Sequence, residues 1–126
     1  MICYFLGAIP FGFIIAKITK GIDIRDFGSG NIGATNVLRT LGAGPASAVF
    51  FLDTGKGFVA VKVCEYLIPN SPYIVVAGAL LSIIGHTLSV FLQFKGGKGV
   101  ATTLGVIFGL NWIAGVITFV LWSLIV

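Results

Sequence analysis

The chain has 126 residues, of which 57% are hydrophobic and 10% are charged, with a mean hydropathy of +1.08. Soluble domains usually carry about 25% charged residues, so this composition excludes an ordinary soluble domain and indicates an integral membrane protein. The net charge is +4, but the sequence has no long basic run with interleaved aromatic residues. This argues against a nucleic-acid partner. Cys3 and Cys64 have no metal-ligand spacing and are interpreted as apolar filler.

The first apolar stretch, residues 2–18, is about long enough to cross a bilayer. A cleaved signal peptide is the alternative, but its positive charge would precede the apolar core, and here Lys17 and Lys20 follow it. We therefore predict a retained first transmembrane helix. Because basic residues gather on the cytoplasmic side, residues 19–44 are expected inside the cell and the N-terminus outside.

Residues 28–33 have the spacing of a dinucleotide-binding fingerprint, G-x-G-x-x-G. That fingerprint needs a preceding buried strand within a βαβ unit, and residues 22–27 instead alternate between polar and apolar side chains. The stretch that follows is of membrane length rather than a compact crossover. We therefore reject the dinucleotide site and predict a glycine-rich, phosphate-compatible turn that leads into a short helix.

This short helix is expected to be capped by Ser29 or Asn31 and ended by Gly42. Asn31, Thr35 and Arg39 recur at four-residue spacing and share one polar face, with Asn36 beside them. A merely solvated helix is the alternative, but such a face tends to use Glu and Lys. Hydroxyls, amides and one guanidinium favour binding of an anion.

The second predicted span, Ala46 to Ile68, carries charged residues at membrane depth, among them Asp53 and Lys56. Buried charges are costly in a bilayer, so these side chains should face protein or a water-filled cavity. Asp53 and Lys56 are three residues apart and share a helical face. Either Lys56 offers its charge to a phosphate while Asp53 positions it, or the two form an ion pair that only holds helices together.

A turn at residues 69–72 precedes the third predicted span, Tyr73 to Leu92. His86, the only histidine, lies on a polar stripe of this span with Ser82, Ser89 and Gln93. A lone histidine is often structural. Its membrane depth and its closeness to the next loop favour a catalytic or orienting role.

That loop, Lys95-Gly96-Gly97-Lys98-Gly99, has two ammonium groups and no acid to neutralise them. Glycines let backbone N–H groups converge on an anion, and a helix starting near Val100 would point its positive dipole end at the same place. The nucleotide-binding P-loop pattern fails, because Leu92 and Gly99 occupy its first glycine and its hydroxyl positions. A basic anchor for lipid headgroups is the alternative to a phosphate site.

Residues 100–110 and 113–126 are apolar, with a break or interface at Asn111-Trp112. We predict an all-α fold, a polytopic transmembrane helical bundle with short interfacial or re-entrant helices at the cytoplasmic face. Residues 1–126 form a single integral-membrane domain in this interpretation, one that ends inside an apolar run and is incomplete at its C-terminus. The three polar clusters are expected to converge on one side of the membrane.

Residues 28–36, 53–57, 85–86 and 94–102 resemble, in this order, the three signature motifs of the PlsY family. These are bacterial inner-membrane glycerol-3-phosphate acyltransferases that use acyl phosphate as donor. The resemblance covers nearly the whole chain and about the first two thirds of a full-length enzyme. It implies transfer of the acyl group to the 1-hydroxyl of glycerol 3-phosphate, with lysophosphatidic acid and phosphate as products.

With this reaction in mind, the phosphoryl group of the acyl phosphate is placed on the Lys95 to Gly99 loop with Thr35 and Asn36, and glycerol 3-phosphate near Ser29, Arg39 and Lys56. His86 is the candidate proton acceptor, although the substrate's own phosphate could serve, and Lys98 the candidate for stabilising the leaving phosphate. The expected catalytic residues are His86, Lys98 and Asn36. The expected substrate-binding residues are Ser29, Gly30, Asn31, Thr35, Arg39, Lys56, Lys95, Gly96, Gly97 and Gly99.

No cofactor and no metal are expected, since the chain has only four acidic residues and Asp53 alone lies near a motif. The expected partners are acyl phosphate, glycerol 3-phosphate and membrane lipid. The alternatives are a small anion transporter or channel subunit, in which the same basic loops line a path, and a lipid-binding structural protein.

Overall fold

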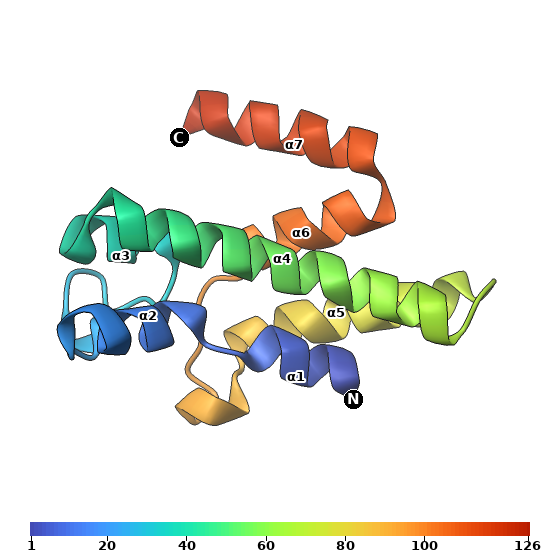
Figure 1. The fold of residues 1–126 in the computed structure, drawn as a ribbon. Helices are drawn as coiled ribbons and strands as arrows, with labels where there is room; N and C mark the ends of the chain where they lie inside the picture. Colours follow the sequence, from blue (N-terminus) through green and yellow to red (C-terminus); the bar gives the residue numbers. More distant parts are fainter.

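The first apolar stretch forms two helices rather than one. In the computed structural model, which describes residues 1–126, α1 (Ile2–Ala8) and α2 (Phe11–Lys20) are separated by Ile9 and Pro10 (Figure 1). Proline has no amide hydrogen, so it cannot continue the hydrogen-bond ladder of α1. The stretch Ile2–Lys20 is long and apolar enough to cross a membrane, as expected, but it is divided into two helices where we expected one.

The segment after α2 contains a 3₁₀ turn, η1 (Ile24–Asp26), and the short helix α3 (Ala34–Leu41). The N-cap of α3 is Gly33, not Ser29 or Asn31 as expected, because the side chain of Asn31 accepts a hydrogen bond from Gly33 N (2.8 Å) outside the helix. The predicted end at Gly42 is confirmed, with a φ of 94° that favours glycine.

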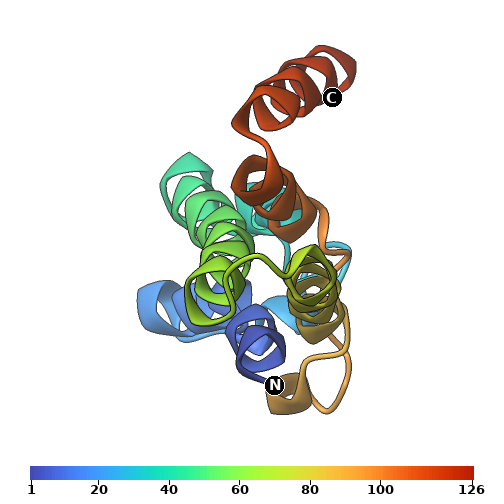
Figure 2. The same cartoon turned by 90° about the vertical axis from the view of Figure 1, so that its right-hand side faces the viewer.

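The longest helix, α4 (Ala43–Leu67), runs through the middle of the bundle (Figures 1 and 2). It starts three residues before the predicted Ala46. Its first part packs in an apolar cluster that includes Val49, and its last part in another that includes Val61 and Cys64. Buried Asp53 and Lys56 lie between these clusters, so α4 carries a polar layer inside an apolar bundle.

Helix α5 (Pro72–Thr87) ends five residues before the predicted Leu92 and is followed by a second 3₁₀ turn, η2 (Val90–Leu92). Gln93 and Phe94 then have positive φ values, which turn the chain back. Gly96 N and Gly97 N donate hydrogen bonds to Thr87 O (3.0 Å) and His86 O (3.1 Å). The loop thereby satisfies carbonyls that the end of α5 leaves free.

The last two helices, α6 (Val100–Leu110) and α7 (Trp112–Ile125), meet at the predicted break. The side chain of Asn111 accepts hydrogen bonds from Ile113 N (3.0 Å) and Ala114 N (3.1 Å) and thus caps α7. Helix α7 lies against α6 and stands away from α1, α2 and α5 (Figures 1 and 2).

The two cysteines lie together rather than serving as separate filler. Cys3 of α1 and Cys64 of α4 are buried with their Sγ atoms 3.2 Å apart, and Gly78 of α5 leaves the space that both sulfurs occupy. We therefore expect copper phenanthroline, an oxidant, to join them by a disulfide. The measurement is the number of thiols that react with maleimide. Oxidation should remove two of them, and this loss should not occur in Cys64→Ala. Full labelling after oxidation would contradict the packing of α1 on α4.

Candidate functional site

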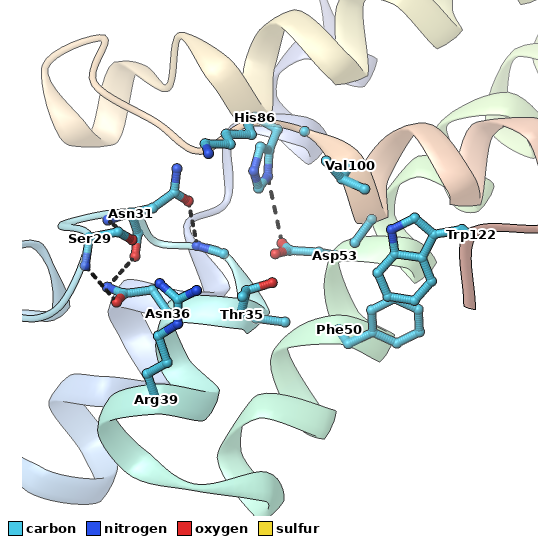
Figure 3. Close-up of a pocket in the computed structure, with 15 residues that line it drawn as sticks. Ser29, Asn31, Thr35, Asn36, Arg39, Phe50, Asp53, His86, Val100 and Trp122 are labelled. Atoms are coloured by element: carbon cyan, nitrogen blue, oxygen red, sulfur yellow. Dashed lines mark hydrogen bonds and ion pairs between the residues drawn. The ribbon is translucent and has the colours of Figure 1, made fainter. Parts of the chain in front are cut away.

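A cavity of about 230 Å³ lies where the loop before α3, α3 itself, the middle of α4, the end of α5 and the start of α6 meet (Figure 3). Its lining combines hydroxyl, amide, guanidinium, ammonium, imidazole and carboxylate groups with five hydrophobic residues. The lining residues are Ser29, Asn31, Gly33, Ala34, Thr35, Asn36, Arg39, Phe50, Asp53, His86, Lys98, Gly99, Val100, Ala101 and Trp122.

The glycine-rich loop takes its shape from the buried amide of Asn36. Asn36 Nδ2 donates to Phe27 O (2.9 Å) and Asn31 O (2.9 Å), and Asn36 Oδ1 accepts from Ser29 N (3.0 Å). A side chain on Gly28 would collide with Asn36 Oδ1. Both amide hydrogens of Asn36 are therefore engaged within the protein, and the geometry fits a positioning residue rather than the catalytic role predicted for it.

The positive charge at the cavity comes from Arg39 and Lys98. Neither side chain forms an ion pair with a carboxylate of the chain, so both charges are available to an anion. Arg25 differs, because it is paired with Asp23 at 2.7 Å. The hydrogen bond from Arg25 holds the pKa of the Asp23 carboxyl below its ordinary value, so Asp23 stays charged and balances this guanidinium.

The lysine loop contributes less of its backbone to the cavity than expected. Lys95 N donates to Leu92 O (3.1 Å), and the amides of Gly96 and Gly97 are used on the end of α5. Lys95, Gly96 and Gly97 do not line the cavity, whereas Lys98 and Gly99 do. In this part of the chain, the free N–H groups at the cavity are therefore those at the start of α6, beginning near Val100, where the helix dipole favours an anion.

His86 and Asp53 face each other at the wall of the cavity (Figure 3). His86 Nδ1 lies 3.7 Å from Asp53 Oδ1, and both side chains are almost fully buried. Lys56 Nζ lies 2.8 Å from the same carboxylate oxygen and 2.8 Å from Ile9 O, to which it donates a hydrogen bond. Lys56 itself does not line the cavity. Of the two interpretations left open for Lys56, its contacts fit the ion pair.

A second, more apolar hollow of about 270 Å³ continues from the cavity along α6 towards α7. Phe50 of α4 and Trp122 of α7 border both spaces, and their rings stack with centroids 5.9 Å apart. Lys98, Val100 and Ala101 also line both. The full lining of this groove is Phe50, Lys98, Val100, Ala101, Thr103, Leu104, Ile107, Thr118 and Trp122.

Most predicted site residues converge on the cavity, and five do not. Those on its lining are Ser29, Asn31, Thr35, Asn36, Arg39, His86, Lys98 and Gly99. Those placed elsewhere are Gly30, Lys56, Lys95, Gly96 and Gly97. Sequence reasoning missed Phe50 and Trp122, because aromatic residues in apolar segments carry no local signal for a site. Asp53 was singled out as a partner of Lys56, and the structure adds its contact with His86.

The helical fold and the apolar spans are those of an integral membrane protein, and its cavity carries the unpaired positive charge of Arg39 and Lys98. The family described as "Glycerol-3-phosphate acyltransferase" matches residues 1–126. The chain belongs to this family, as its three motifs indicated.

Individual relatives agree with this assignment. Glycerol-3-phosphate acyltransferases of Trichormus variabilis and Thermotoga petrophila are 43% and 45% identical over 100% and 98% of the chain. The crystal structure of PlsY, described as an integral membrane glycerol 3-phosphate acyltransferase in its glycerol 3-phosphate form, is 44% identical over 98% of the chain, with a TM-score of 0.92. The chain covers 63% and 62% of the two enzymes and 62% of the PlsY chain, so it spans less than two thirds of these relatives.

Proposed function

We propose that the protein containing this chain transfers an acyl group from acyl phosphate to the 1-hydroxyl of glycerol 3-phosphate. The observation that carries the proposal is that two spaces adjoin: the cavity with Arg39 and Lys98 shares Phe50, Lys98 and Trp122 of its lining with the more apolar groove. A ligand with a phosphate head and an acyl tail matches both. The solved PlsY structures, described as glycerol 3-phosphate and lysophosphatidic acid forms, support this class of ligand.

In the proposed reaction the 1-hydroxyl oxygen attacks the carbonyl carbon of the acyl phosphate. The bond between that carbon and the phosphate oxygen breaks, and inorganic phosphate leaves with its electron pair. Lys98 and the N–H groups at the start of α6 stabilise the charge that grows on this phosphate. Acyl phosphate already has a good leaving group, so no covalent enzyme intermediate is needed.

Glycerol 3-phosphate is assigned to the part of the cavity beside Ser29 and Arg39. The hydroxyl proton passes to the substrate's own phosphate rather than to His86, which is almost fully buried. The motif H-x-x-x-x-D of acyl-CoA-dependent enzymes is absent, since Phe91 occupies the position of its aspartate. This absence agrees with acyl phosphate as the donor.

The proposed location is the bacterial inner membrane, with several crossings. The C-terminal end of α2 carries Lys17 and Lys20, and the cavity adds Arg39 and Lys98. Basic residues favour the cytoplasmic side, so the cavity is assigned to the cytoplasm and the N-terminus to the outside. This arrangement would also let the charged, water-soluble glycerol 3-phosphate reach the cavity.

Purified full-length protein in lipid vesicles provides the test. We expect release of phosphate and formation of lysophosphatidic acid only when acyl phosphate and glycerol 3-phosphate are both present. A transporter would instead carry anions across the vesicle membrane without an acyl donor. Anion flux without lysophosphatidic acid would overturn the proposed function in favour of that alternative.

A further inference from the structure

The break between α1 and α2 is held by polar side chains from other parts of the bundle. Lys56 Nζ of α4 donates to Ile9 O at the break (2.8 Å), and Ser89 Oγ donates to Ala8 O. Irregular backbone at membrane depth is tolerated where neighbouring groups satisfy its carbonyls. Lys56 Nζ also lies 5.6 Å from the centre of the ring of Phe11, the first residue of α2. Lys56 therefore contacts both the break and the helix that follows it.

Helix α2 packs directly against the glycine-rich turn that precedes α3. A side chain on Gly12, the second residue of α2, would overlap Ile32 O, so the two backbones are in contact. Ala16 of α2 and Ile32 are buried in the same apolar cluster. Ile32 lies between Asn31 and Gly33, both of which line the cavity. The position of α2 therefore determines where this part of the cavity wall lies.

Ile32 also lies beside the lysine loop. A methyl group on Gly97 would be 3.2 Å from Ile32 Cγ1, which is closer than an ordinary van der Waals contact. Lys98, the next residue of that loop, lines the cavity. Ile32 therefore contacts both α2 and the lysine loop, and a shift of α2 would disturb more than one part of the site.

An ammonium is an unfavourable choice for packing alone at the position of Lys56. A buried ion pair has little advantage over apolar residues of similar size, because desolvation offsets much of the attraction. An apolar side chain at this position could contact Phe11, but it could not donate a hydrogen bond to Ile9 O. The contact at the break therefore favours a specific role for the ammonium.

We propose that Lys56 and Gly12 are positioning residues of the anion site: Lys56 fixes the start of α2 at the break, and Gly12 lets α2 support the backbone of Ile32 in the glycine-rich turn. Asp53 compensates the charge of Lys56 at 2.8 Å and so permits its burial. Neither Lys56 nor Gly12 lines the cavity, so both act through the turn. The inference rests on the proposed function, which assigns glycerol 3-phosphate to the part of the cavity beside this turn.

Alanine at the two glycines that flank the break separates support of the turn from general packing. In full-length protein, Gly12→Ala forces α2 and Ile32 apart, so KM for glycerol 3-phosphate should rise roughly 10-fold to 100-fold, with a smaller change in kcat. Gly7→Ala is the matched control, because its methyl group would overlap Ser82 O of α5 and not the turn. We expect a lower thermal midpoint in both variants and an unchanged KM in Gly7→Ala. A wild-type KM in Gly12→Ala, or equal rises in the two variants, would overturn the inference.

The role of Lys56 is tested without leaving a buried charge unpaired. The double variant Asp53→Asn with Lys56→Met removes the donor at the break and leaves the net charge unchanged. KM should rise as in Gly12→Ala, with no further rise when all three changes are combined, because both act on the position of α2. The control is Lys62→Met with Glu65→Gln, an exposed ion pair of 2.8 Å on the same helix, for which KM should not change. Independent, additive effects would overturn the role of Lys56.

A second readout does not depend on turnover. Glycerol 3-phosphate that binds the folded protein raises its thermal midpoint. We expect this shift in the wild type and in Gly7→Ala, and a smaller shift at the same ligand concentration in Gly12→Ala. No shift in the wild type, or an equal shift in Gly12→Ala, would overturn the inference. Wild-type protein that shows the expected shifts but forms no lysophosphatidic acid would instead reject the proposed function and retain the support of the turn by α2.

Discussion

Replacing Lys98 with alanine is expected to abolish most acyl transfer while the protein stays folded. Lys98 lines both the polar cavity and the apolar groove and has no carboxylate partner, so its charge is available where the phosphate would leave. Loss of one preorganised donor to a developing negative charge typically costs about 100-fold to 1000-fold in kcat. Phosphate release and lysophosphatidic acid formation by full-length protein measure the effect, and thermal unfolding checks the fold.

Lys95→Ala is the matched control, because the same loop supplies both lysines. Both lysines are exposed, but Lys95 lies outside the cavity lining, so water and salt screen its charge from a phosphate bound there. We expect only a small loss of kcat in this variant. Wild-type turnover in Lys98→Ala would remove the leaving-group assignment. Equal losses in the two variants would indicate a general effect of positive charge rather than a contact.

Gly57→Ala is expected to be a damaging change despite adding only one methyl group. Helices α4 and α6 pack so closely that a methyl group on Gly57 would overlap the carbonyl of Thr102, and one on Gly105 would overlap that of Thr54. The obstacle in each case is backbone, which cannot rotate away. Forcing extra volume into a packed core costs roughly 1–3 kcal/mol or more, so both the thermal midpoint and activity should fall.

Gly55→Ala tests the same change two residues earlier in α4. No atom lies within 4 Å of a methyl group placed there, and alanine is the better helix former. We expect an unchanged or higher thermal midpoint and retained activity. If Gly57→Ala were tolerated as well as Gly55→Ala, the close approach of α4 and α6 would be contradicted.

The spans could be predicted because their signals are local. Apolar length indicated the first and third membrane segments and the long helix at the second, and the turn at residues 69–72 and the break at Asn111 were found where proline and asparagine predicted them. The break after Ile9 was missed, although Pro10 carried its signal, because the apolar run continued beyond it. The early end of α5 had no such signal, since it follows from hydrogen bonds made by a loop farther along the chain.

The motifs likewise indicated the kind of site more reliably than the role of each residue. Glycines and basic residues in three clusters predicted an anion site, and the cavity gathers residues from all three. Asn36 was interpreted as catalytic, yet its amide is occupied by the loop that it shapes. Phe50 and Trp122 were not selected at all, because their stacking joins residues that are far apart in sequence.

The sequence by itself determined a helical membrane protein with phosphate-compatible clusters, because hydropathy, charge and glycine spacing are properties of short segments. The tertiary structure decided which groups are free to act. In the lysine loop, the amides of Gly96 and Gly97 are used on α5, which leaves Lys98 and the start of α6 for an anion. Lys56 is turned away from the cavity, towards Asp53 and Ile9 O. A buried donor binds whichever acceptor packing brings to it, and residues 47 positions apart meet only after the chain has folded.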